Sequence, residues 1–147
     1  MPYIRLYSRE VSLAEKRMLA EKLMSIALSA FHLSEQERHQ VTIQFLSRSL
    51  CPAQLDGQFG SGETSAVLEV SEHDLTVQKI TAFVEAATPM LSESAAVKHS
   101  GPIARMLGRE ADPARQIAFQ FNDTGSAAGR NGYYGHGVIQ MSGSEAA

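Results

Sequence analysis

Apolar and polar residues alternate at the start of the chain, and this alternation predicts a β-strand. Pro2, Ile4 and Leu6 fall on one face of the strand, whereas the residues between them are aromatic or charged. A proline at the first position of a strand interrupts no hydrogen bond when its nitrogen lies beyond the paired residues. The same pattern predicts three more strands, over residues 41–45, 65–70 and 116–122.

After residue 12 the apolar residues recur every three or four positions, which predicts an amphipathic helix. Ser12 and Glu15 have the spacing of a capping box, in which each side chain accepts a hydrogen bond from the backbone amide of the other. The helix should therefore begin at Ser12, and it should end near residues 32–34. Its expected buried stripe consists of Leu19, Leu23, Ile26, Ala27, Ala30 and Phe31.

The same spacing predicts a second helix that ends near residue 91. Asp74 is its expected N-cap, because a short side-chain oxygen satisfies free amides at a helix start. Pro89 should kink or end this helix, since proline lacks the amide hydrogen that a helix interior needs. Its expected buried face consists of Val77, Ile80, Val84, Ala87 and Leu91.

These elements form a β-α-β unit within residues 1–48 and a second one within residues 65–123, followed by a C-terminal tail over 124–147. Parallel strands joined through a helix require a right-handed crossover. Two such units side by side give a four-stranded sheet with both helices on one face. We therefore expect an α+β fold of two layers, as a single domain over residues 1–147, which is the usual size of one domain.

The sheet face away from the helices is expected to mix polar and apolar side chains. It should carry Arg5, Thr42, Gln44, Glu69 and Gln120. Such a face is poorly suited to water but suited to packing against other copies of the chain. We therefore expect an oligomer.

Composition excludes several classes of function. The 147 residues carry a formal net charge of −3 and a pI near 5.9, which gives no broad attraction to nucleic acid or anionic lipid. No apolar stretch approaches the roughly 20 residues that span a bilayer, and no signal peptide is recognisable. The single cysteine, Cys51, cannot form an internal disulfide. We expect a cytoplasmic protein without nucleic-acid or membrane partners.

Pro2 is the main candidate for chemistry. If Met1 is removed, Pro2 becomes the N-terminal residue, and only proline then offers a secondary amine. Such an amine is a base, whereas the amide nitrogen that exists with Met1 in place cannot accept a proton. The structural alternative is that Pro2 merely begins the strand.

The order of the elements and three local motifs resemble the tautomerase superfamily, the enzymes with an N-terminal proline typified by 4-oxalocrotonate tautomerase and macrophage migration inhibitory factor. The first motif is Met1-Pro2 followed by a strand, a long helix and a second strand. The second is Gln-Phe-Gly-Ser-Gly-Glu at 58–63, similar to the glycine-rich turn of both archetypes. The third is the strand and small-residue loop over 115–129, similar to the branch of macrophage migration inhibitory factor. The resemblance covers nearly the whole chain except residues 93–114.

The resemblance implies a fold that assembles as a homotrimer, with Pro2 in an apolar pocket beside a subunit boundary. Burial disfavours the cation of the amine and lowers its pKa toward the range of a useful general base. The implied reaction is cofactor-independent keto–enol tautomerisation of a small α-keto or enol acid. The implied partner is therefore a small carboxylate-bearing substrate, and no cofactor is expected.

Three further residues are candidates by the same resemblance. Arg9 lies one or two positions from the place of the carboxylate-binding arginine of short tautomerases, and its alternative is a solvated loop charge. Phe59 matches the phenylalanine of the glycine-rich turn and would keep the pocket dry or anchor the turn. His73 could donate to an enolate oxygen or simply begin a helix. Dehalogenases and decarboxylases of the superfamily carry arginines just after the third strand, where this chain has none at 70–74, so neither activity is expected.

The C-terminal tail contributes the last candidates. In relatives this tail packs near the pocket of a neighbouring subunit, which makes Arg130, Tyr134 and His136 candidates for substrate contact. The dipeptide at 131–132, Asn-Gly, predicts a tight turn, and residues 138–141 predict a short added strand.

Two other functions fit the sequence. A non-catalytic trimeric domain that binds a ligand or partner is favoured by the missing arginines and the displaced Arg9. A hydratase using the same proline is the other. No metal site is expected, because His32, His39 and His99 lack the spacing of metal ligands, and Cys51 has no evident partner base.

Overall fold

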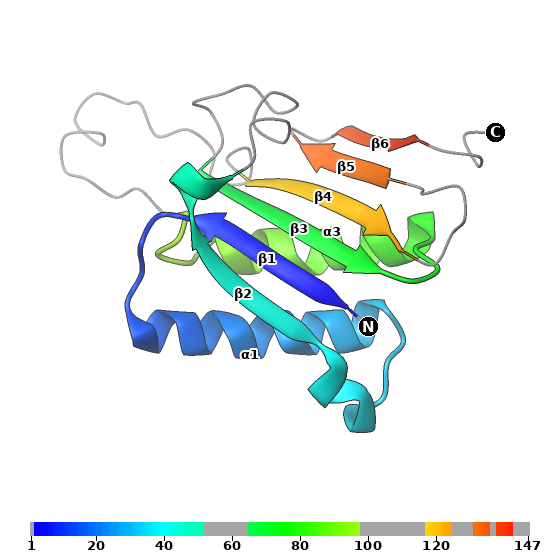
Figure 1. The fold of residues 1–147 in the computed structure, drawn as a ribbon, viewed down its shortest axis with the longest axis horizontal. Helices are drawn as coiled ribbons and strands as arrows, with labels where there is room; N and C mark the ends of the chain where they lie inside the picture. The colour runs from blue at the N-terminus through cyan, green and yellow to red at the C-terminus, as the bar shows by residue number, and fades with distance from the viewer. Residues whose placement is uncertain (1, 52–64, 98–116, 125–130, 136–137, 143–147) are drawn as a thin grey trace.

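The computed structural model describes residues 2–51, 65–97, 117–124, 131–135 and 138–142. Its elements follow the order strand, helix, strand in each half of the chain, and two further strands complete the sheet (Figure 1). They are β1 (Tyr3–Ser8), α1 (Leu13–Ala30), the short 3₁₀ helix η1 (Glu35–Gln40), β2 (Thr42–Ser47), the 3₁₀ turn η2 (Arg48–Leu50), β3 (Ala66–Glu72), α3 (Val77–Ser92), β4 (Ile117–Asp123), β5 (Asn131–Gly135) and β6 (Val138–Ser142).

The sheet has the strand order β2-β1-β3-β4-β5-β6. Strands of the same unit are parallel, as in β1 with β2 and β3 with β4, whereas β1 and β3 join the two units in antiparallel fashion. At this junction Leu6 lies opposite Phe45 on one side and Leu68 on the other. The predicted arrangement of four strands and two helices is confirmed, and β5 and β6 extend it by an antiparallel hairpin.

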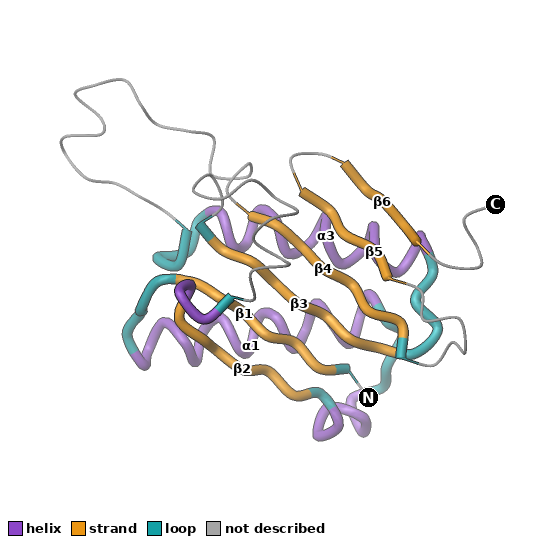
Figure 2. Tube along the Cα trace, turned by 45° about the horizontal axis from the view of Figure 1, so that its top comes forward, coloured by secondary structure: helices purple, strands orange, loops and turns teal. Residues whose placement is uncertain are grey.

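Both helices cover the same face of the sheet, so the fold has two layers (Figure 2). Even-numbered residues of β1 and β3 and odd-numbered residues of β4 face the helices and are almost fully buried. The main core joins these strands to both helices; its largest fully buried side chains include Phe83, Phe119, Phe121, Ile4, Leu6, Leu19, Leu23 and Leu68. Within the described ranges, neither helix has the length and apolar character needed to cross a membrane.

Aromatic rings form the centre of this core. Phe83 of α3 stacks on Phe31 with ring centroids 5.4 Å apart, which ties the second helix to the end of the first. It also meets Phe119 and Phe121 of β4 edge to face, at 6.3 and 5.9 Å. Both geometries are favoured by the charge distribution of aromatic rings.

The start of α1 matches its prediction in part. The Ser12 hydroxyl accepts a hydrogen bond of 3.2 Å from the amide of Glu15, so Ser12 is the N-cap. The Glu15 carboxylate, however, accepts from the amide of Ala95 at 3.2 Å, which links α1 to the segment after α3. The helix ends at Ala30, slightly earlier than predicted, and Ile26 is only partly buried.

The start of α3 differs from its prediction. Thr76 is the N-cap, and its hydroxyl accepts from the amide of Lys79. Asp74 instead lies in the turn between β3 and α3, in a left-handed conformation with a φ of 52°. Val77 is 55% exposed rather than buried, and α3 continues past Pro89 to Ser92.

In the tail, the predicted strand over 138–141 is confirmed as β6. The predicted tight turn at 131–132 is wrong, because these residues begin β5 and pair with β4. The backbone ladder to β4 thus overrides the local turn preference of an Asn-Gly pair.

Candidate active site

Pro2 lies directly before β1 and is buried. Its carbonyl oxygen accepts a hydrogen bond of 3.0 Å from the amide of Thr42, the first residue of β2. Since proline has no amide hydrogen to donate, this carbonyl is the backbone group that ties Pro2 to the sheet. The residue that follows Met1 is therefore held in place at one end of the sheet.

Two acidic residues end β3 and β4 at the same end of the sheet as Pro2. Glu72 is the last residue of β3, Asp123 is the last residue of β4, and the two are partners in the parallel ladder. Each is only 5% exposed. Tyr3 lies opposite Ser71 in the antiparallel pair, so Pro2 and Glu72 are next in line at the same end of the sheet.

The two carboxylates order the turn that leads from β3 to α3. The Glu72 Oε1 atom accepts a hydrogen bond of 2.7 Å from the amide of His73. The Asp123 Oδ2 atom accepts one of 3.2 Å from the amide of Leu75. His73 itself is exposed at the same end of the sheet as Pro2. Of the predicted site residues with described side chains, Pro2 and His73 are therefore the two that one chain brings to a common region.

Arg9 lies at the other end of β1. Six strand residues separate it from Pro2, which corresponds to about 20 Å. Its Nε atom donates to the carbonyl oxygen of Ala95 at 2.7 Å. Beside it is a shallow hollow of about 40 Å³, enough for little more than a water molecule, lined by residues that include Arg9, Lys16 and Phe45. One chain therefore does not place Arg9 beside Pro2.

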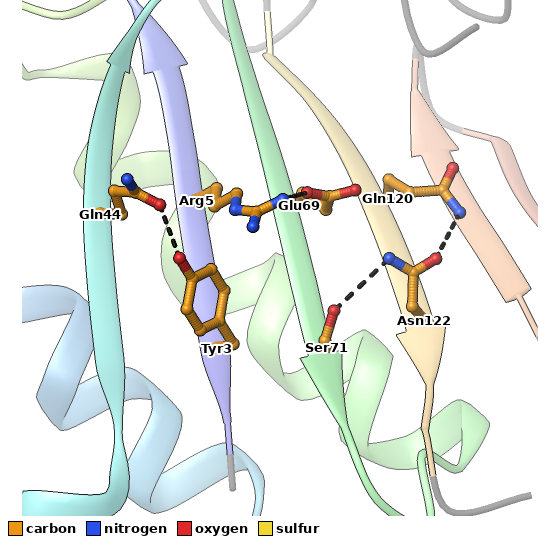
Figure 3. A network of polar contacts seen from close by, with 7 residues as sticks. All are labelled: Tyr3, Arg5, Gln44, Glu69, Ser71, Gln120 and Asn122. Atoms are coloured by element: carbon orange, nitrogen blue, oxygen red, sulfur yellow. Dashed lines mark hydrogen bonds and ion pairs between the residues drawn. The ribbon is translucent and has the colours of Figure 1, made fainter. Parts of the chain in front are cut away.

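Polar side chains cover much of the sheet face opposite the helices, as predicted (Figure 3). The Tyr3 hydroxyl donates to Gln44 Oε1 at 2.6 Å, and Arg5 Nη1 donates to Glu69 Oε1 at 3.2 Å. The Arg5 guanidinium also lies over the Tyr3 ring, 4.8 Å from its centroid. Interaction with the Tyr3 side chain raises the pKa of Arg5 above its usual value, and the hydrogen bond with Glu69 and the charge of Glu69 add to this effect, so Arg5 remains a cation.

The network continues across β3 and β4. Gln120 Nε2 donates to Asn122 Oδ1 at 3.2 Å, and Asn122 Nδ2 lies 3.5 Å from Ser71 Oγ. Gln120 Oε1 and Arg5 Nε are buried without a hydrogen-bond partner in the described part of the chain. Buried polar atoms are usually paired, so this face is incompletely satisfied by the residues that the structure describes.

Next to this network, Tyr7 packs in a small cluster with Leu46, Cys51, Val67 and Ala118. Tyr7 is 3% exposed. Burial raises the pKa of its phenol, because the phenolate would lose its hydration.

Phe59, Arg130 and His136 lie outside the described residues. Tyr134 belongs to β5, where its backbone pairs with Phe119. Among the residues that the structure describes, no group of three or more His, Cys, Asp or Glu side chains could hold a metal ion.

Glu72 and Asp123 were not recognised as site candidates in the sequence. Each ends a row of alternating helix-facing residues that are otherwise apolar, such as Leu68 and Val70 before Glu72. A carboxylate that continues an apolar row is the signal that could have revealed them. Their proximity to one another and to Pro2 depends on strand pairing, which the alternation alone does not specify.

Neither a protein-family model nor a curated protein matches the chain, but solved structures share its fold. A macrophage migration inhibitory factor-like protein from Entamoeba histolytica aligns with a TM-score of 0.57 at 12% identity, covering 84% of this chain and 89% of the other. A malonate semialdehyde decarboxylase, described with decarboxylase and hydratase activities, gives 0.52 at 13% identity and covers 86% of each chain. A fused 4-OT, described as an asymmetric trimer, gives 0.53 at 15% identity, over 84% of this chain and 86% of the other.

All three structures have the fold of the tautomerase superfamily. The chain described here therefore has the tautomerase fold, as the sequence resemblance predicted. The likeness extends over both β-α-β units, since it covers more than four fifths of the chain.

Proposed function

We propose that this chain is a member of the tautomerase superfamily and a cofactor-independent keto–enol tautomerase of a small α-keto or enol acid. Pro2, freed by removal of Met1, acts as the general base and then as the general acid. The observation that carries the proposal is the burial of Pro2 directly before β1, at the same end of the sheet as the exposed His73, in a fold shared with enzymes.

The reaction needs one group that moves a proton. The lone pair of the Pro2 nitrogen takes a proton from the carbon next to the ketone, and the electrons of the broken C–H bond form the enolate. The protonated nitrogen returns the proton to the enolate oxygen to give the enol, and the reverse sequence regenerates the ketone. Pro2 is buried in the chain that carries Met1. A nitrogen that stays shielded in this way after Met1 is lost has a less favoured cation than in water, which keeps a share of the amine free to act as a base.

The other roles are part of the same proposal. His73, exposed at the same end of the sheet as Pro2, donates a hydrogen bond to the developing enolate oxygen. Arg9 is the candidate for the substrate carboxylate, and it must come from another copy of the chain because its own Pro2 is about 20 Å away. A homotrimer is supported by this separation, by the incompletely satisfied sheet face, and by the trimeric 4-OT neighbour.

The first test combines intact mass with activity. The mass of the purified chain should correspond to loss of Met1, and the protein should convert phenylpyruvate or 2-hydroxymuconate between enol and ketone. Pro2→Ala should abolish the conversion while the circular dichroism spectrum stays native. A protein that has lost Met1 but is no more active than Pro2→Ala contradicts the proposal.

A covalent probe provides an independent readout. One structural neighbour is described as inactivated by 2-oxo-3-pentynoate. The same compound should add its mass once to this chain, at Pro2, and Pro2→Ala should remain unmodified. Labelling elsewhere, or equal labelling of the variant, would argue against a reactive Pro2 nitrogen.

Hydration is the second candidate reaction, because the malonate semialdehyde decarboxylase neighbour is described with a hydratase activity. In this case an acetylenic acid should be hydrated at a rate that depends on Pro2, and tautomerisation should be slow. If Met1 is removed and neither reaction occurs, a non-catalytic trimeric domain that binds a ligand or partner becomes the favoured function.

A further inference from the structure

Glu72 is the buried acidic residue closest in register to Pro2, and the reaction outlined above gives it no role. We propose that the Glu72 carboxylate controls the protonation of the Pro2 nitrogen, as a positioning residue that holds the proton there between the two transfers. This inference rests on the proposed function, because it requires the free nitrogen of Pro2.

Strand pairing places the two residues next to each other. β1 and β3 are antiparallel with Tyr3 opposite Ser71, so the next positions outward are Pro2 and Glu72. The hydrogen bond from the Thr42 amide to the Pro2 carbonyl keeps Pro2 in line with the sheet at this point. Directly opposite residues of an antiparallel pair have Cβ atoms about 5 Å apart, within the range over which a charge shifts a neighbouring pKa.

The Glu72 side chain is also held by a hydrogen bond and shielded from solvent. Its Oε1 atom accepts from the amide of His73 at 2.7 Å, and the residue is 5% exposed. A charge in such a position is screened less by water and salt than a surface charge. Asp123, equally buried, lies one strand further from Pro2 and should act in the same direction with a smaller effect.

The other titratable groups that the structure describes at this end are less buried. The connection from α1 to β2 carries His32, Glu37, His39 and Arg38, and Arg38 is paired with Glu21 and Glu35. The turn after β3 and the first turn of α3 carry His73, Asp74 and Lys79, whose Nζ atom donates to the Asp74 carbonyl. All seven are partly or fully exposed, so Glu72 and Asp123 are the buried acidic residues described at this end.

Burial and Glu72 therefore act on the Pro2 nitrogen in opposite directions. Burial favours the neutral amine, whereas the carboxylate favours the ammonium ion. With these two effects opposed, the Pro2 nitrogen accepts the substrate proton readily. It then keeps the proton until the enolate oxygen is in position to take it back. Removing the negative charge should leave burial unopposed, so the nitrogen should lose its proton at a lower pH.

Glu72→Gln tests this with little structural change, because the amide oxygen of glutamine can still accept from the His73 amide. The pKa of the Pro2 nitrogen is measured by NMR titration of protein carrying 15N-labelled proline, with Met1 shown to be absent by mass. Glu72→Gln should lower this pKa by about one unit or more. Asp123→Asn should lower it by less. Glu69→Gln, on the opposite face of the sheet and paired with Arg5, is the matched control and should leave it unchanged.

Three results would overturn the inference. One is a Pro2 pKa that is the same in Glu72→Gln and wild type, and another is an equal shift in the Glu69→Gln control. The third is a Pro2 nitrogen that does not titrate because Met1 is retained, which overturns the proposed function as well. If Glu72→Gln does not fold, Glu72→Asp keeps the charge but withdraws it by one methylene, and the pKa should still fall measurably.

The titration requires no turnover, so the two proposals can fail separately. A free Pro2 nitrogen that responds to Glu72→Gln in an inactive protein contradicts the tautomerase but supports this inference. An active enzyme whose Pro2 pKa is unchanged in Glu72→Gln supports the tautomerase but contradicts this inference. In an active enzyme, the acid limb of the kcat/KM profile should move to lower pH in Glu72→Gln, a change that a purely structural role for Glu72 does not produce.

Discussion

Pro2 and Arg9 lie at opposite ends of the same strand, Pro2 directly before β1 and Arg9 directly after it. β1 is central to the four-stranded part of the sheet, with β2 on one side and β3 on the other, so the strand cannot bend to bring the two residues together (Figure 1). A site that uses both residues must therefore be built from two copies of the chain.

Mixing Pro2→Ala and Arg9→Ala subunits tests this arrangement. Each variant alone should have little activity. When the two are unfolded, combined in equal amounts and refolded, random assembly restores both side chains at about a quarter of the sites, and about this fraction of wild-type activity should return. Each variant refolded alone is the control. A site contained in one chain would give no recovery at any mixing ratio.

The aromatic core predicts a large cost for truncating Phe83. This side chain is fully buried and contacts the ring of Phe31, directly after α1, and rings of β4, so Phe83→Ala should lower the free energy of unfolding by about 3–5 kcal/mol. Phe83→Leu should cost less, because it leaves a smaller cavity. Urea denaturation followed by circular dichroism measures both. Leu50→Ala, at a residue 63% exposed, should change stability by no more than about 0.5 kcal/mol.

The Arg5–Glu69 pair on the open face should stabilise the fold modestly. The side chains are 41% and 19% exposed, so water screens the ion pair in part. A double-mutant cycle with Arg5→Met and Glu69→Gln should give a coupling of about 0.5–1 kcal/mol, smaller at high salt. A coupling that is absent at low salt would show that the contact contributes nothing measurable.

Burial of Tyr7 predicts a loss of stability at high pH. Its phenol has a raised pKa in the folded chain, so the folded state disfavours the phenolate more than the unfolded state does. The contribution is fully present below the unfolded pKa of about 10 and is lost as the pH rises through the folded value. The free energy of unfolding, measured from about pH 8 to pH 11, should fall less steeply in Tyr7→Phe than in wild type. Parallel curves would contradict the prediction.

The periodicity of the sequence was sufficient to predict most of the secondary structure and the two-layer arrangement. Each of the four core strands is within two residues of its predicted position, because one face of each is buried and its alternation is correspondingly clear. β5 was missed because its glycines and asparagine favour turns locally, and only pairing with β4 makes it a strand. The cap of α3 was assigned two residues early, since Asp74 and Thr76 both have suitable side chains.

The candidate site was less accessible from the sequence. Pro2 could be selected by its chemistry alone, and His73 by its place in a family pattern. The separation of Arg9 from Pro2 follows from the length and straightness of β1. The grouping of Glu72 with Asp123 required the register of β3 and β4, which joins residues 51 positions apart in sequence.

The antiparallel pairing of β1 with β3 also determines how the two halves of the chain associate. The two β-α-β units share their core across this pair of strands, where Leu6 lies opposite Leu68. Hydrogen bonds and buried apolar surface hold the two units together. Neither requires a continuous backbone between the units. Cleaving the backbone between residues 52 and 64 should therefore yield two fragments that reassociate into the native fold. Neither fragment should fold alone.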